Sequence, residues 1–214
     1  MIKNRHRDRR AFVLGSGPSL NGHDLSWLAG EITVGANKVY LATREAGWVP
    51  RYLCVTDPVM AQFVAEDYAG LDAQVVMERR AVERSGYLAY NLALIADIVR
   101  PYVHGAWTWD VESPMVQQES RSVIAALALP LAVWLGCNPI YLLGCDCTAN
   151  GHAYDAIEEA RHDNHPPDTF RDLHLPAFEL ARREAERIGV AVFNAGKGGA
   201  LEAFPRCDYE ALRP

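Results

Sequence analysis

The sequence predicts an α/β fold with a mostly parallel sheet, and three observations support this. Short apolar runs alternate along the chain with stretches in which apolar residues recur at helical spacing. The first apolar run ends in glycine, serine and proline, which is typical of a turn from a buried strand into a helix. At 214 residues the chain can bury a sizeable core. We therefore expect a Rossmann-like sheet with helices on both faces, in a single domain over residues 1–214.

Six apolar runs are the predicted strands of this sheet. A parallel sheet is covered by helices on both faces, so its strands read as continuous apolar runs rather than as an alternating pattern. The runs are Ala11–Leu14, Ile32–Gly35, Arg51–Val55, Gln74–Met77, Pro139–Leu143 and Val190–Phe193.

Six further segments are the predicted helices, and the last carries the clearest signals. Pro176 suits a first helical turn, apolar residues then recur at helical spacing, and Gly189 suits the stop. The predicted helices are Asp24–Ala29, Lys38–Glu45, Val59–Tyr68, Leu88–Val99, Ser122–Leu135 and Pro176–Ile188.

Two segments do not follow the alternation of strands and helices. Residues 79–120 hold several tyrosines and tryptophans with weak periodicity. Residues 148–173 are polar, rich in histidine, aspartate and asparagine, and contain two successive prolines. A long irregular segment in a compact domain is commonly a lid or a binding segment. We therefore expect a polar lid segment over about residues 148–173 that folds over the functional site.

The loop after the first predicted strand is the strongest signal for function. Small residues at this position let backbone amides and a helix N-terminus approach a phosphate. The loop lacks the third glycine of the dinucleotide motif G-x-G-x-x-G and the G-K-[ST] of a P-loop. It therefore indicates a nucleotide site of another kind, while a tight turn without a ligand stays the alternative. The residues expected to bind the nucleotide are Gly15, Ser16, Gly17, Pro18 and Ser19.

Polar residues also follow three other predicted strands. Asn37 comes after the second strand, Asp57 after the third and Asp146 after the fifth. Because the carboxyl ends of parallel strands meet at one edge of the sheet, these side chains are expected to converge on a ligand. Asn37 and Asp57 would serve equally well as helix N-caps, and Asp146 as the cap of a turn, so both roles stay open for each residue.

Composition and charge narrow the class of protein. The formal net charge is −6, which makes a nucleic-acid partner less expected. The opening residues lack the apolar region of a secretion signal, and no apolar run is long enough to span a bilayer. The five cysteines are odd in number and do not form a disulfide pattern. We expect a reduced, cytoplasmic protein without a membrane span.

One polar cluster resembles a set of metal ligands. Histidine and carboxylate side chains ligate divalent ions, and His152, Asp155, His162, Asp163 and His165 lie close together in the sequence. Such clusters also occur in solvated loops. We therefore assign no metal site.

Several short motifs, taken in order, resemble those of the bacterial lipooligosaccharide sialyltransferases. The likeness extends over about residues 12–204. The same pattern is similar to a broader group of motility-associated, flagellin-modifying transferases and archaeal 6-hydroxymethylpterin diphosphokinases, which typically carry His-Ala after G-x-D, as at residues 152 and 153. The motifs are G-x-G-P-S-L from residue 15, G-A-N-K-V-Y from residue 35, Y-L-x-V-T-D-P from residue 52, S-R-S from residue 120, G-C-N-P-I-Y-L-L-G-C-D from residue 136 and N-G-H-A-Y from residue 150.

The sialyltransferase resemblance implies a CMP-sugar donor held by the glycine loop and by Asn37. It places Ser120 and Arg121 against the nucleotide. Tyr154 matches one of two tyrosines that hold the leaving phosphate in that family, whereas the second tyrosine position corresponds to Cys147.

This chain departs from the family pattern at several positions. Ser16 and Asp57 stand where the family has asparagine. The family's general base is a histidine in the loop before the last long helix, and His162, His165 and His174 are all candidates. These departures put the identity of the donor in question more than the class of reaction.

Sugar transfer from a nucleotide needs a base for the acceptor hydroxyl and charge stabilisation for the departing phosphate. A histidine suits the first role because its ordinary pKa lies near neutrality. We predict His174 as the base, with His165 as the second candidate. Ser19, Arg121, Tyr154 and backbone amides would stabilise the phosphate.

The sequence therefore predicts a glycosyltransferase that moves a sugar from a nucleotide-sugar donor to a hydroxyl of a glycan, a protein or a small molecule. No cofactor is expected, and a homo-oligomer stays open. One alternative is a pterin diphosphokinase-like phosphotransferase in which Mg²⁺ bridges phosphates through carboxylates such as Asp57 and Asp146. A second alternative is a nucleotide-binding module that has lost its chemistry.

Overall fold

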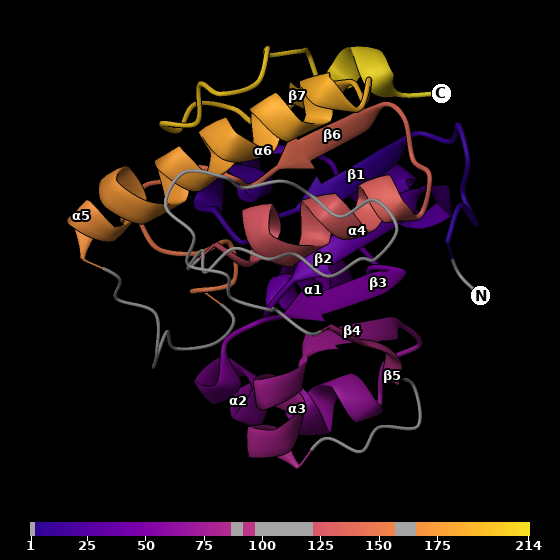
Figure 1. Ribbon diagram of the computed structural model, residues 1–214, viewed down its shortest axis with the longest axis vertical. Helices are drawn as coiled ribbons and strands as arrows, with labels where there is room; N and C mark the ends of the chain where they lie inside the picture. The colour runs from indigo at the N-terminus through magenta and orange to yellow at the C-terminus, as the bar shows by residue number, and fades with distance from the viewer. Residues whose placement is uncertain (1–2, 87–91, 97–121, 157–165) are drawn as a thin grey trace.

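The computed structural model describes residues 3–86, 92–96, 122–156 and 166–214. They form a seven-stranded sheet of order β5-β4-β3-β2-β1-β6-β7 (Figure 1), in which every neighbouring pair is parallel. The predicted α/β fold is confirmed. The strands are β1 (Ala11–Leu14), β2 (Ile32–Ala36), β3 (Tyr52–Val55), β4 (Gln74–Glu78), β5 (Leu92–Ala96), β6 (Ile140–Leu143) and β7 (Val192–Asn194).

Helices and single helical turns connect the strands. The α-helices are α1 (Val39–Glu45), α2 (Pro58–Ala69), α3 (Arg79–Ser85), α4 (Leu129–Trp134), α5 (Pro167–Thr169) and α6 (Leu175–Arg187). Three segments are 3₁₀-helical, namely η1 (Pro18–Gly22), η2 (Ser26–Gly30) and η5 (Glu210–Leu212). Two are π-helical, namely η3 (Ile124–Ala128) and η4 (Phe170–His174).

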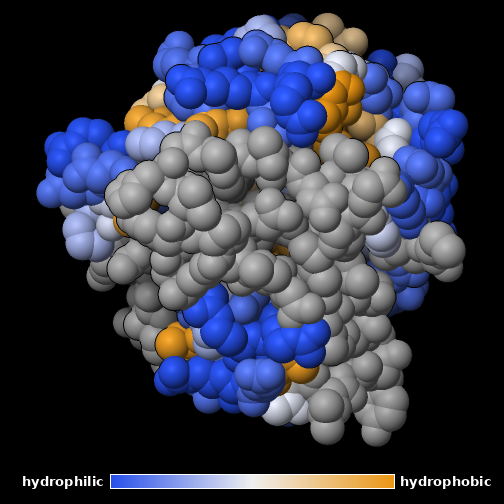
Figure 2. Space-filling view, in the orientation of Figure 1, coloured by the Kyte–Doolittle hydropathy of each residue, from blue (hydrophilic) through white to orange (hydrophobic). Residues whose placement is uncertain are grey.

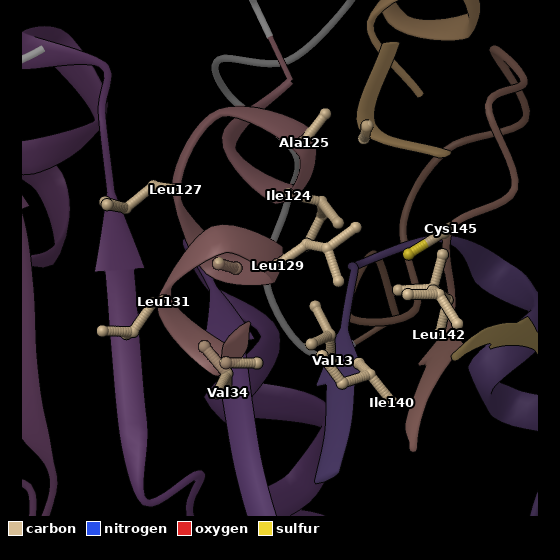
Figure 3. Packing of buried hydrophobic residues seen from close by; sticks show 14 of the residues in the cluster. Val13, Val34, Ile124, Ala125, Leu127, Leu129, Leu131, Ile140, Leu142 and Cys145 are labelled. Carbon is tan, nitrogen blue, oxygen red and sulfur yellow. The ribbon is translucent and has the colours of Figure 1, made fainter. Parts of the chain in front are cut away.

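The core consists of two hydrophobic clusters, one on each face of the sheet. In β1 the side chains alternate between them, with Val13 in the cluster beneath η3, α4 and α6 and Phe12 in the cluster beneath η1, η2 and α1 to α3. Figure 3 shows the first cluster, in which Leu129 lies close to Val13 and Ile140. Because helices cover both faces, all residues of β1, β2 and β3 are buried, which explains their continuous apolar sequence.

Helix α6 confirms the clearest helix prediction. Phe178, Ala181 and Ala185 face the core, and the charged residues between them leave a hydrophilic outer surface (Figure 2). Pro176 lies in the first turn, and Gly189 follows the helix with a φ of 73°, the left-handed conformation that glycine adopts without strain.

The path of the chain creates a switch point beside β1. From β1 the chain builds β2, β3, β4 and β5 outward in one direction and then returns to place β6 on the other side of β1. In an open parallel sheet a crevice forms at the carboxyl ends of the strands where the direction reverses. A binding site is therefore expected among the residues that follow β1, β2 and β6.

The predicted helix at Leu88–Val99 is wrong, because residues 92–96 of that segment form β5. This strand pairs with β4 in parallel, with Val76 opposite Leu94. A short apolar run such as Leu-Ala-Leu-Ile-Ala fits a buried strand and a buried helix equally well, so periodicity alone could not decide between them.

Other differences from the predicted elements are smaller. The predicted helix Asp24–Ala29 is the 3₁₀ turn η2, and the short helix α3 was not expected. Of the predicted lid at residues 148–173, residues 157–165 lie outside the described residues. In the described part of the chain, no helix combines the length and the apolar character needed to cross a membrane.

Candidate functional site

A cleft opens at the carboxyl ends of β1, β2 and β6, at the switch point of the sheet. The space between its walls, with the open mouth included, is about 690 Å³. The loops after these three strands line it together with the start of η3, the segment η4 and one residue of α6. The lining residues are Gly15, Ser16, Gly17, Ala36, Asn37, Ser122, Val123, Ile124, Gly144, Cys145, Asp146, Cys147, Thr148, Gly151, His152, Phe170, His174 and Phe178.

Three glycines let the loops after β1 and β6 cross in close contact. A Cβ atom on Gly17 would lie 2.7 Å from the Gly144 carbonyl oxygen, and one on Gly144 would lie 2.6 Å from the Gly15 carbonyl oxygen. Gly144 also has a φ of 62°, which disfavours a side chain. The Gly-x-Gly pattern therefore serves the approach of two backbone segments, and it forms the floor of the cleft.

The loop amides that were expected to hold a phosphate are used within the protein. The Gly15 amide donates to the Leu143 carbonyl and the Gly17 amide to the Gly144 carbonyl, both at 2.8 Å. The Ser19 amide donates to the Asp146 carboxylate at 2.9 Å. The amides of Gly15, Gly17 and Ser19 are therefore already engaged, and the nucleotide-binding role of the loop stays a prediction. Gly15, Ser16 and Gly17 still line the cleft, whereas Pro18 and Ser19 belong to η1 behind it.

Asp146 joins three segments at the edge of the cleft. Its carboxylate accepts hydrogen bonds from both the amide and the hydroxyl of Ser19, and its carbonyl accepts one from the Ala200 amide at 2.7 Å. A Cβ atom on Gly199 would lie 2.7 Å from that carbonyl oxygen. The capping role that the sequence left open for Asp146 is therefore present, at a residue that also lines the cleft.

Asn37 lines the cleft in a constrained conformation. Its φ of 50° is left-handed, a region that asparagine tolerates better than most residues. Its amide donates to the Cys54 carbonyl at 3.0 Å, and its carbonyl accepts a 2.6 Å hydrogen bond from the Tyr68 hydroxyl. Its Oδ1 atom is buried and has no hydrogen-bond partner among the described residues. A buried amide oxygen in a cleft is suited to accept a hydrogen bond from a ligand.

His174 reaches the cleft from η4, the π-helical segment that leads into α6. Its ring packs edge-on against Phe170, with the centroids 4.9 Å apart. The other π-helical segment, η3, contributes Ile124 to the lining. Short π-helical segments occur often at functional sites, because they displace side chains from the regular helical positions. The structure thus places the predicted base in the cleft.

His152 lies on the loop after β6 and is held by Asp155. The His152 amide donates to Asp155 Oδ2 at 2.7 Å, and Nδ1 of its ring lies 3.5 Å from Oδ1 of the same carboxylate. The ring stacks on Tyr154 with the centroids 5.0 Å apart. Tyr154 itself is buried and is not among the residues that line the cleft, whereas His152 is.

Asp57 caps α2 and does not line the cleft. Its Oδ1 atom accepts hydrogen bonds from the amides of Val59 at 2.6 Å and Met60 at 3.0 Å. This is the N-cap role that the sequence allowed beside nucleotide binding, and its binding role stays a prediction.

Three predicted site residues, Ser120, Arg121 and His165, lie outside the described residues. His162 and Asp163 of the candidate metal cluster do so as well. Among the residues that the structure describes, no three or more histidine, cysteine, aspartate or glutamate side chains gather as a metal site would require.

Sequence reasoning missed several residues that line the cleft. Ser122 directly follows the predicted Ser120 and Arg121, so the S-R-S motif was a signal for it. Phe170 and Phe178 gave no signal, because aromatic residues at helical spacing usually belong to the core. His152 was noted as a candidate metal ligand and as part of the His-Ala pair of the resemblance, but no role in the nucleotide site was predicted for it.

Two thiols in the cleft are poor nucleophiles. Burial, followed by the nearby Cys147 and Asp146, raises the pKa of Cys145 well above its ordinary value. Burial and the charge of Asp146 raise the pKa of Cys147 to about 12. Because the thiolate is the reactive form, neither side chain is suited to covalent catalysis near neutral pH.

Comparison with known proteins shows a shared fold. No protein-family model and no curated protein matches the chain. The structure of the MAf glycosyltransferase from Magnetospirillum magneticum AMB-1 aligns over 97% of this chain with a TM-score of 0.62 and 14% sequence identity. The alignment covers 35% of that protein, so this chain spans about a third of its relative's length.

A second solved structure is the sialyltransferase CstII from Campylobacter jejuni, determined in complex with a substrate analogue, cytidine-5′-monophosphate. It aligns over 97% of this chain and 86% of its own length, with a TM-score of 0.55 and 15% identity. Both neighbours are glycosyltransferases, so the fold expected from the sialyltransferase resemblance is confirmed. The resemblance to pterin diphosphokinases stays a prediction.

Proposed function

We propose that this protein is a glycosyltransferase that moves a sugar from a nucleotide-sugar donor to a hydroxyl acceptor. The observation that carries the proposal is the cleft at the switch point, where Asn37, His152 and His174 meet from three separate segments of the chain. The fold supports the proposal, because two glycosyltransferases have the same fold and the structure of one of them contains a cytidine nucleotide. A CMP-activated donor is therefore the first candidate.

The lining side chains suit the parts of such a reaction. The buried Oδ1 atom of Asn37 would accept a hydrogen bond from the nucleotide. His174 would take the proton of the acceptor hydroxyl as its oxygen attacks the anomeric carbon. The apolar wall formed by Phe170 and Phe178 would exclude water, which otherwise competes with the acceptor.

The described carboxylates fit a magnesium-dependent phosphotransferase less well. Such an enzyme would bind Mg²⁺ through carboxylates such as Asp57 and Asp146. Asp57 accepts two helix amides outside the cleft, and both oxygens of Asp146 accept hydrogen bonds from Ser19. Both carboxylates therefore already have structural roles, and this supports sugar transfer over phosphoryl transfer.

A thermal-shift panel tests the proposal. CMP, CDP, UDP, GDP and ATP are each added with and without Mg²⁺. A ligand at about a hundred times its Kd adds roughly 2.7 kcal/mol to stability, which gives a clear shift. We expect stabilisation by CMP or another nucleotide without metal, followed by sugar transfer from the matching donor. Stabilisation by Mg-ATP alone would favour the phosphotransferase, and tight binding without any turnover would favour an inactive nucleotide-binding module.

A further inference from the structure

The glycine loop offers the phosphate of a donor in this cleft few free amides and no positive charge. The amides of Gly15, Gly17 and Ser19 all donate to acceptors within the protein. The Asp146 carboxylate at the same edge is negative and would repel a phosphate. Positive charge for the leaving group is therefore expected from other residues, and Arg121, one predicted source, lies outside the described residues.

Among the described lining residues, the side chains that can carry positive charge are His152 and His174. The two histidines lie in different surroundings. His174 packs against Phe170 on the wall formed by η4. His152 belongs to the turn whose next residue, Ala153, donates its amide to the Ser16 carbonyl at 2.8 Å. This hydrogen bond places His152 beside the glycine loop, where the phosphate is expected.

Asp155 fixes the orientation of His152. Oδ2 of its carboxylate accepts a 2.7 Å hydrogen bond from the His152 amide and fixes the backbone of the turn, which sets where the ring begins. The Asp155 carboxylate also lies 3.5 Å from Nδ1 of the ring, so its charge faces this side of the imidazole without a hydrogen bond to it. The flat stack on the buried Tyr154 restrains the ring further.

We propose that His152 binds the leaving phosphate and protonates it, with Asp155 as its positioning residue. The inference rests on the proposed function, because it assigns a group to the phosphate of the same donor. It transfers to His152 the role that the family resemblance gave to Tyr154.

The proposed step uses both histidines. The bond between the anomeric carbon and the phosphate oxygen breaks, and its electron pair stays on that oxygen. His152 passes a proton to the phosphate. The acceptor oxygen forms the new bond to the anomeric carbon, and its proton passes to His174. One histidine loses a proton and the other gains one, so atoms and charge balance, and exchange with solvent restores both.

The test compares two ligands on matched variants. CMP and cytidine differ only in the phosphate, so the ratio of their affinities by calorimetry reports the phosphate contact. We expect His152→Ala to weaken CMP binding by about tenfold to a hundredfold, as for loss of a charge-assisted hydrogen bond, and to leave cytidine binding unchanged. The matched control His174→Ala should keep the wild-type ratio of CMP to cytidine affinity and should lose only turnover.

Two further variants separate the contact from the proton transfer. His152→Gln retains a neutral donor, so CMP affinity should recover in part while kcat stays at least about a hundredfold low. Asp155→Asn keeps an oxygen for the His152 amide but removes the charge, and it should lower kcat and CMP affinity with cytidine binding unchanged.

An unchanged ratio of CMP to cytidine affinity in folded His152→Ala, or full turnover in His152→Gln, would overturn the role of His152. The proposed function would not be affected. Thermal unfolding of each variant verifies that it folds. If the wild-type protein binds none of the panel nucleotides, the proposed function itself fails, and the role of His152 fails with it.

Discussion

Gly17 shows how a single missing side chain shapes this site. A Cβ atom there would lie 2.6 Å from the carboxyl carbon of Asp146 and 2.7 Å from the Gly144 carbonyl oxygen. Both neighbours are held by hydrogen bonds of their own, so neither can move aside easily. The residue is therefore required by packing at the crossing of two loops, independently of any ligand.

Gly17→Ala should lower the free energy of unfolding by about 1–3 kcal/mol, as overpacking of a tight site typically does. Gly30→Ala is the matched control, because an added Cβ atom meets nothing within 4 Å at that position. It should change stability by less than about 0.5 kcal/mol. Denaturant unfolding measures both variants, and equal stability of the two would contradict the packing role of Gly17.

His6 makes stability depend on pH. Its Nε2 atom lies 2.8 Å from the Tyr52 hydroxyl in a buried position. Burial, followed by the positive charges of Arg51, Arg5 and Arg9, lowers the pKa of His6 below 6.5. In the unfolded chain the pKa returns to its ordinary value. Between the two values the unfolded state therefore binds more protons than the folded state.

The free energy of unfolding should fall as the pH drops from 6.5 through the lowered pKa of folded His6. The variant His6→Gln can keep the hydrogen bond to Tyr52 but cannot titrate, so its stability should fall less over the same range. Urea unfolding at several pH values measures the difference. The pKa of His23 is also lowered, by burial and by Lys197. His23 therefore keeps some pH dependence of the free energy of unfolding in the variant. Parallel curves for both proteins would exclude the role of His6.

At the scale of elements, Asp57 at the start of α2 has a capping role that can be tested apart from nucleotide binding. Asp57 accepts the amides of Val59 and Met60, and Pro58 occupies the first helical turn. This arrangement satisfies donors that a helix start would otherwise leave without partners.

Asp57→Ala should cost about 1 kcal/mol of stability, whereas Asp57→Asn should cost little, because asparagine caps a helix equally well. Thermal or urea unfolding gives the stability, and calorimetry with the nucleotide from the panel gives the affinity. Asp57→Asn should bind that nucleotide as the wild type does if Asp57 is only a cap. A large loss of affinity in this stable variant would instead support the predicted nucleotide contact.

The whole molecule decides which thiols can react. All five cysteines are free, and Cys54, Cys137, Cys145 and Cys147 are buried in the same core cluster, the one that contains Val13. Burial raises the pKa of each, to about 12 for Cys137 and Cys147. Cys207 is partly exposed, although burial and Asp208 raise its pKa as well.

In the folded protein a thiol reagent should therefore label Cys207 first, and all five cysteines should react after unfolding. Cys207→Ser should remove the early phase and leave the slow phase unchanged. Mass spectrometry after brief labelling identifies the site. Early modification of Cys145 or Cys147 would show that the cleft opens more than this structure implies.

The sequence predicted the sheet where burial on both faces left continuous apolar runs, as in β1, β3 and β4. It failed at β5, because its five apolar residues become a strand only through pairing with β4. It also predicted that Gly15, Asn37 and Asp146 meet at one edge, because parallel strands all end on the same side.

By itself the sequence determined the class of fold, and it predicted the edge where the cleft lies and His174 as a residue there. Only the tertiary structure decided which polar residues reach the cleft. It turns Asp57 toward the amides of α2, engages the amides of Gly15 and Gly17 with the end of β6 and the residue after it, and stacks His152 on Tyr154. These outcomes depend on contacts between segments far apart in the chain, and local patterns carry no information on such contacts.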